Sequence, residues 1–72
     1  MHARFKVRFT YVEPSYARAR GFEAAEYSAG VEVIATTSAE AVTLATEMFR
    51  EANARSGVGW EREIRSATWV AL

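Results

Sequence analysis

Residues 26–52 read EYSAGVEVIATTSAEAVTLATEMFREA and contain two different hydrophobic periods. Apolar and polar residues alternate over residues 26–36, which is the period of a half-buried β-strand. From residue 38 onward apolar residues recur every three or four positions, which is the period of an amphipathic helix. The change of period predicts a strand that passes directly into a helix.

A capping sequence marks the start of this helix. Residues 37–40 read TSAE, in which the hydroxyl of either Thr37 or Ser38 serves as the N-cap and the glutamate reaches back toward it. We expect the helix to span about 38–55. Its core-facing stripe is predicted to comprise Ala41, Val42, Ala45, Met48, Phe49 and Ala52.

The flanking segments predict two further strands and a long connection. Residues 4–12 alternate cleanly between aromatic or aliphatic and polar side chains. The third strand is expected at about 60–71, with its even-numbered residues on the core face unless a bulge near Ser66 reverses the alternation and brings Trp69 to the core. The connection 13–25 is expected either to contain a short helical turn or to extend the hairpin as a twisted ribbon.

Charge predicts the order of the strands. On the face away from the helix, the charged residues of the first strand are all basic, whereas the other two strands carry glutamates. Opposite charges on neighbouring strands are stabilising and like charges are destabilising, so the basic strand belongs in the middle. The predicted fold is therefore α+β: a two-layer ββαβ domain over residues 1–72, with an antiparallel three-stranded sheet in the order 2-1-3 and one helix on one face. The residues that carry this argument are Arg4, Lys6, Arg8, Glu26, Glu32, Glu61 and Glu63.

Composition argues against an enzyme. The 72 residues hold nine basic and nine acidic side chains, no cysteine and a single histidine, His2, near the start. A disulfide framework, a thiolate zinc site and a thiol nucleophile are thereby excluded, and a lone histidine has no second group to hold it as a base. We predict no catalytic residue, no cofactor, no metal ligand and no small-molecule substrate. No apolar run is long enough for a membrane span or a signal peptide, so we expect a cytoplasmic protein without a membrane partner.

Two surfaces are candidates for binding a partner. Ile34 and Trp69 are expected on the sheet face that the helix leaves open, where an exposed tryptophan is typical of a protein interface. Tyr16, Arg18 and Arg20 lie in the connection 13–25, and arginine with tyrosine on an exposed loop is typical of recognition of a protein with an acidic surface. The structural alternatives are a buried Trp69 and a Tyr16 that only fastens the connection to the sheet edge.

The small size of the domain favours association. A chain of this length buries only about 60% of its unfolded surface. It has no disulfide or metal to compensate, and the strands at 26–36 and 60–71 are predicted to have open edges that can pair with a second copy. We therefore expect a homodimer, a complex with another protein, or both.

Residues 32–42, EVIATTSAEAV, with the helix that continues to Phe49, resemble a pattern found in small phage and mobile-element proteins. In that pattern an alternating strand passes through a Thr/Ser-x-x-Glu cap into an alanine-rich helix. DpnD/PcfM-like ββαβ proteins are similar over residues 26–52 and the preceding strand, and HicB-like antitoxins are similar more distantly. The connection 13–25 and the strand 60–71 depart from the pattern. The resemblance implies a phage or mobile-element accessory protein that acts on a host protein or a defence system in the host cytoplasm, and it carries over no catalytic residue.

These observations favour a non-enzymatic protein-binding accessory module that acts through homodimerisation, capture or inhibition of a host protein, or both. One alternative is a small nucleic-acid-binding protein that uses the basic N-terminal strand and the following loop. Another is a structural subunit of a larger assembly.

Overall fold

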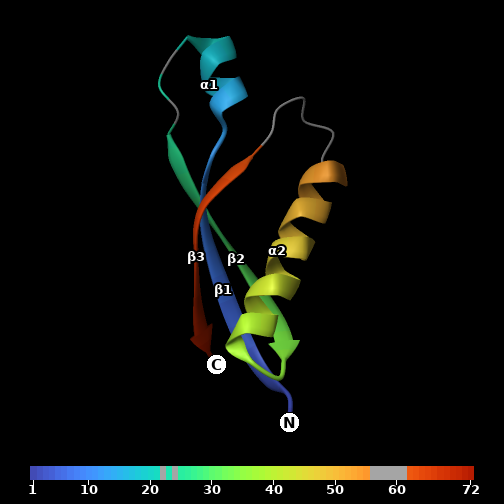
Figure 1. Cartoon of the computed structure of the whole chain (residues 1–72). Helices are drawn as coiled ribbons and strands as arrows, with labels where there is room; N and C mark the ends of the chain where they lie inside the picture. The colour runs from blue at the N-terminus through green and yellow to red at the C-terminus, as the bar shows by residue number, and fades with distance from the viewer. Residues whose placement is uncertain (22, 24, 56–61) are drawn as a thin grey trace.

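The computed structural model describes residues 1–21, 23, 25–55 and 62–72. The elements along the chain are β1 (Ala3–Val12), α1 (Pro14–Arg20), β2 (Glu26–Ala35), α2 (Ser38–Arg55) and β3 (Glu63–Ala71). The strands form one antiparallel sheet in the order β2-β1-β3, as predicted, and α2 lies along one side of it. The short helix α1 sits at the far end of the β1–β2 hairpin (Figure 1). The α+β class is confirmed, with one helix more than the sequence required.

The charge argument for the strand order holds on one side of β1 only. A guanidinium nitrogen of Arg4 lies 3.7 Å from a carboxylate oxygen of Glu32 on β2. On the other side, the Glu63 carboxylate lies 3.6 Å from Arg65 of its own strand. Glu61 lies outside the described residues. The predicted order is correct, but among the described residues only one ion pair, Arg4–Glu32, joins the central strand to a neighbour, and that neighbour is β2.

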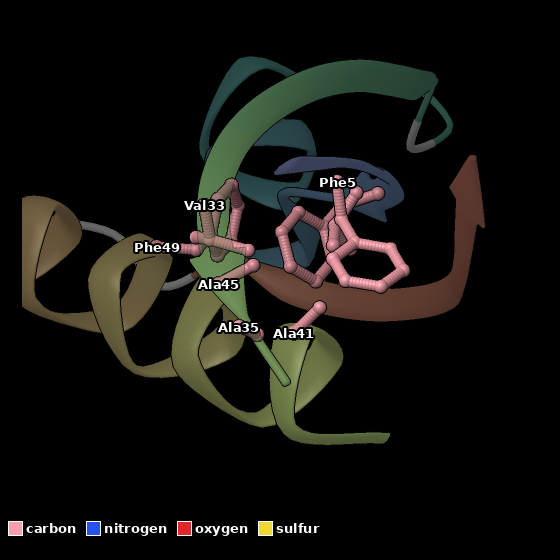
Figure 2. Close-up of a cluster of buried hydrophobic side chains, with 8 residues drawn as sticks. Phe5, Val33, Ala35, Ala41, Ala45 and Phe49 are labelled. Carbon is pink, nitrogen blue, oxygen red and sulfur yellow. The ribbon is translucent and has the colours of Figure 1, made fainter. Parts of the chain in front are cut away.

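The core lies between α2 and the sheet, and small residues bring the two layers close together. Figure 2 shows Ala41 and Ala45 of α2 facing the strands, beside the larger ring of Phe49. Alanine at these positions leaves room for the phenylalanines of β1, and the rings of Phe9 and Phe49 are 5.0 Å apart. The buried cluster comprises Phe5, Val7, Phe9, Val33, Ala35, Ala41, Ala45 and Phe49.

The apolar stripe of α2 is rotated from the predicted one. Met48 is half exposed and Ala52 is exposed, although both were assigned to the core. Leu44 packs against the buried cluster instead. The helix therefore faces β2 more directly than its hydrophobic pattern indicated.

Thr37 is the N-cap of α2. Its hydroxyl oxygen accepts a hydrogen bond from the Glu40 amide at 3.1 Å. The Glu40 carboxylate in turn accepts hydrogen bonds from the Thr36 amide at 3.4 Å and the Thr36 hydroxyl at 2.9 Å. The capping box is therefore present, with its carboxylate bound one residue before the N-cap, and it fixes the turn between β2 and α2.

The connection between β1 and β2 contains a helix rather than an extended ribbon. Pro14 occupies the first turn of α1, where its missing N–H removes no helical hydrogen bond. Gly21 ends the helix in the left-handed conformation, with φ 76°, and its N–H bonds to the last-turn carbonyls. A residue with a Cβ is strained in that conformation, so Gly21 makes the sharp end of α1 possible.

A β-bulge divides β3 into two parts. Thr10 lies opposite Ser66, but the next residue of β1, Tyr11, lies opposite Ile64, which leaves Arg65 as an extra residue. Ile64 packs against the buried cluster on the α2 side. Beyond the bulge the alternation is reversed, which is the alternative predicted for a bulge near Ser66.

The bulge places Trp69 on the same side of the sheet as α2. Trp69 lies opposite Val7, whose side chain is fully buried, and its indole packs edge-on to Phe5 with 5.9 Å between the ring centroids. The expectation that Trp69 projects from the open face is therefore wrong, and so is the core assignment of the even-numbered residues beyond the bulge. Trp69 is nevertheless 50% exposed, because it lies on the edge strand.

The molecule is elongated and retains much surface. It measures 48 × 21 × 14 Å, and its radius of gyration is 13.7 Å, against about 11 Å for a compact domain of this length. Its accessible surface is 5044 Å², against about 4,450 Å² for an ordinary monomer of this mass. An open sheet with one covering helix thus leaves an excess of exposed surface. No helix in the described ranges is both long and apolar enough to cross a membrane.

Candidate protein-interaction edge

Beyond the bulge, the outer edge of β3 lacks the features that normally protect an edge strand. The segment 66–72 reads SATWVAL and contains no charged residue and no proline. By contrast, the other edge strand, β2, carries Glu26 and Glu32. Charged side chains and prolines on an edge prevent pairing with another chain. The edge of β3 beyond the bulge, residues 66–72, is therefore the part of the sheet most open to a further strand; we call it the β3 edge.

The backbone directions on this edge follow from one hydrogen bond. The Leu72 N–H donates to the Arg4 carbonyl at 2.9 Å, so the backbone of Leu72 points toward β1. Successive residues of an antiparallel strand point their N–H and C=O groups to alternate sides. The N–H and C=O groups of Ala67, Trp69 and Ala71 consequently point outward, where a further strand would bind.

Apolar side chains flank these backbone groups on both faces of the sheet. Trp69 is half exposed on the α2 side, and Val70, opposite Lys6, is 61% exposed on the open face. The Leu72 side chain is exposed as well. Figure 1 shows that α2 lies toward β2 and leaves the lower half of β3 uncovered on that side. The edge thus combines free backbone hydrogen-bonding groups with exposed apolar surface.

The predicted partner-binding residues do not form one surface. Ile34 is 63% exposed on the open face of β2, as predicted, whereas Trp69 lies on the opposite face at the opposite edge. Tyr16, Arg18 and Arg20 lie on α1, at the far end of the hairpin. The structure therefore separates them into three places, and only Trp69 lies on the β3 edge.

The arginines of α1 also have a structural role. Arg18 and Arg20 lie in the last turn of the helix, where a positive charge interacts favourably with the helix dipole. The Arg20 guanidinium lies over the ring of Tyr16, 5.6 Å from its centroid. Both arginines remain exposed.

A basic stripe runs along the open face of β1. Arg4, Lys6 and Arg8 occupy alternate positions of the central strand, but of these only Arg4 forms an ion pair with a described residue, Glu32. The stem of Lys6 lies across Gly30, where an added Cβ would come within 3.0 Å of Lys6 Cε. Among the described residues, the strand-order argument from opposite charges is thus supported by an ion pair only at Arg4.

A shallow groove of about 480 Å³ lies along the edge of β2, beside α2. Exposed Ile34 and half-exposed Met48 give it an apolar wall, and Arg4 and Glu32 line it as well. Across the described part of the chain, no three potential metal-ligating side chains cluster together, and no buried polar side-chain atom lacks a partner. The groove is therefore a second apolar surface, whose lining charges, Arg4 and Glu32, pair with each other.

Comparison of the chain with protein-family models, with curated proteins and with solved structures finds no match. The resemblance to DpnD/PcfM-like proteins stays a prediction.

Two contributors to the β3 edge were missed in the sequence. Val70 and Leu72 were assigned to the core face, and the outward-pointing backbone groups were not considered. The sequence does carry the signal for an unprotected edge, since 66–72 is an uncharged run on a strand expected at the sheet edge.

Proposed function

We propose that this chain is a non-enzymatic protein-binding module that pairs the β3 edge with a β-strand of another polypeptide. The observation that carries the proposal is the uncharged, open edge with the half-exposed Trp69 at its centre. In strand addition, backbone hydrogen bonds supply affinity and alternate side chains supply specificity. The β3 edge offers both.

Trp69 is suited to anchor such a complex. Its indole already packs edge-on against buried Phe5, so part of its freedom is lost before any partner binds. A preorganised side chain costs less conformational entropy on binding than a mobile one. Tryptophan is also the residue type most enriched among interface hot spots.

The partner is a second copy of the chain, a host protein, or each in turn. Exposed Arg18 and Arg20 favour a host protein with an acidic surface, at a site separate from the β3 edge. Such a module fits the accessory role, of phage or mobile-element type, that the sequence pattern predicts.

Affinity capture with matched variants tests the proposal. We expect Trp69→Ala to lower the recovery of bound polypeptides, the chain itself included, by about tenfold or more, because it removes the anchor. Arg18→Glu should lower the recovery of an acidic partner only. Met48→Ala, which truncates a half-exposed apolar side chain on α2, is the control and should retain wild-type recovery. Equal quantities of the same polypeptides on the wild type and Trp69→Ala, measured by mass spectrometry, would contradict the proposal.

Binding of nucleic acid is a second candidate because Lys6 and Arg8 form no ion pair with any described residue. The rings of Phe5, Phe9 and Tyr11, however, point to the α2 side, so the basic face lacks a platform on which bases could stack. Contacts would be limited to phosphates and would weaken steeply with salt. In a gel-shift titration at two salt concentrations we expect no shift. A salt-sensitive shift that Lys6→Glu abolishes would favour this candidate instead.

A structural subunit of a larger assembly is the remaining alternative. Light scattering separates this alternative from the proposal, since a structural subunit would form a ring or a higher oligomer.

A further inference from the structure

We infer that the strand bound at the β3 edge is β3 of a second copy, in antiparallel register with Trp69 opposite its own counterpart. This inference rests on the proposed function and names the partner. A continuous sheet of two copies would result, with a two-fold axis perpendicular to the sheet at Trp69.

The backbone favours this register. With the axis at Trp69, Ala67 lies opposite Ala71 of the second copy, and the outward N–H and C=O groups of all three residues find partners. Moving the axis to Thr68 pairs Ala67 with Trp69 instead. Ala71 then lies opposite the bulged Arg65, where regular pairing is interrupted. The register centred on Trp69 therefore forms the more complete ladder.

In the same register, the side chains of one copy are complementary to those of the second copy. On the α2 side, the order Ala67, Trp69, Ala71 is the same in both chain directions, so each indole has an indole opposite and alanines diagonally beside it. On the open face, Thr68 lies opposite Val70 of the second copy, which pairs two β-branched residues. Because no side chain of residues 66–72 is charged, the pairing brings no like-charged side chains together.

The arrangement also covers what the single copy leaves exposed. A two-fold axis perpendicular to the sheet keeps both α2 helices on one face, with the two indoles in the space between them. Each half-exposed Trp69 then loses contact with water, which is favourable for apolar surface. Because only one short strand pairs, we expect a dissociation constant on the order of micromolar.

Sedimentation over a range of concentrations tests the second copy as partner. We expect the wild type to reach twice the 8.0 kDa chain mass at high concentration. Ala67→Pro should remain a monomer, because the Ala67 N–H points outward and its loss spares the ladder to β1. Ser28→Pro is the matched control, since by the same alternation Ser28 points outward on the opposite edge, and it should dimerise like the wild type. Circular dichroism checks that each variant is folded; if Ala67→Pro is not, Ala67→Lys places a charge on the same edge and should likewise give a monomer.

Introduced cysteines test the register, because the chain has none of its own. Thr68 and Val70 of the second copy would form a non-hydrogen-bonded pair with a Cα separation of about 4.5 Å, which a disulfide can span. We expect oxidation of a mixture of Thr68→Cys and Val70→Cys chains to give a disulfide-linked heterodimer in at least several-fold higher yield than either variant alone. Rapid self-linkage of Thr68→Cys would place the axis at Thr68 and overturn the register.

The outcomes separate the inference from the proposed function. A wild type that stays monomeric, or an Ala67→Pro variant that still dimerises, overturns the inference. If the monomer nevertheless captures another polypeptide in a Trp69-dependent manner, the proposed function stands. If it captures none, both fail.

Discussion

Phe9→Ala is expected to lower the free energy of unfolding by about 3–5 kcal/mol. Phe9 lies at the middle of the central strand, its side chain is fully buried, and its ring packs against Phe49 at 5.0 Å. The surrounding helix and strands cannot all collapse into the space it leaves, so a cavity remains. A domain of 72 residues has a total stability of about 4–11 kcal/mol. This one change should therefore remove a large part of the stability, and in a weakly stable chain all of it.

Urea unfolding followed by far-UV circular dichroism measures this effect. The control is Ile34→Ala, which removes an aliphatic side chain that is largely exposed on the open face of β2. Ile34→Ala should lower the free energy of unfolding by less than about 1 kcal/mol, because an exposed side chain buries little apolar surface on folding. Both variants should be measured at one protein concentration, since self-association would add to the apparent stability. Similar unfolding midpoints for the two variants would contradict the assignment of Phe9 to the centre of the core.

Arg62→Met is expected to lower the free energy of unfolding by about 2 kcal/mol. Hydrogen bonds to charged groups are worth about 1.5–3 kcal/mol each, and the new contacts of the methionine side chain offset part of their loss. The Arg62 guanidinium donates to the Glu13 carboxylate at 3.2 Å and to the Asn53 side-chain oxygen at 2.6 Å. It also lies over the ring of Tyr11, 5.7 Å from the centroid. Arg62, the residue before β3, thus links the end of β1 to the last turns of α2. Its loss removes the cation that faces a Glu13 side chain only 14% exposed.

Arg55→Met provides the matched control for the same unfolding measurement. Arg55 forms an ion pair with Glu51 one helical turn away, and both side chains are well exposed. Exposed pairs at this spacing contribute about 0.3–0.5 kcal/mol. Arg62→Met should therefore shift the unfolding midpoint several times further than Arg55→Met. Equal shifts would show that the contacts of Arg62 add nothing beyond those of a surface ion pair.

The sequence was sufficient for the elements whose hydrophobic pattern is regular. β1 and β2 end within one residue of the predicted bounds, and α2 spans residues 38–55 as expected. These segments have one polar and one buried face, so a shift of one residue would expose the core, and their period is strongly constrained. The order of the strands was also correct, with Arg4 and Glu32 supplying the expected contact.

The rest depended on interactions that the sequence does not display. The bulge at Arg65 is set by how β3 pairs with β1, and it decides on which face Trp69 lies. The rotation of α2 toward Leu44 depends on how closely the alanines let it approach the sheet. The direction of each backbone group on the β3 edge required the Leu72 hydrogen bond. The candidate site could therefore be predicted as a residue, Trp69, but not as a surface.

The bulge also separates two tasks along β3. On the N-terminal side of Arg65, Ile64 packs against the buried cluster and Arg62 bonds to Glu13 and Asn53 of the same chain. Residues 66–71 pair with β1 on one side and leave the other side of the strand open. A copy that left a paired assembly would keep its interior intact, so subunits could exchange without unfolding. The fraction of chains that are paired would then depend on the concentration of the chain, and not on which copies were synthesised together.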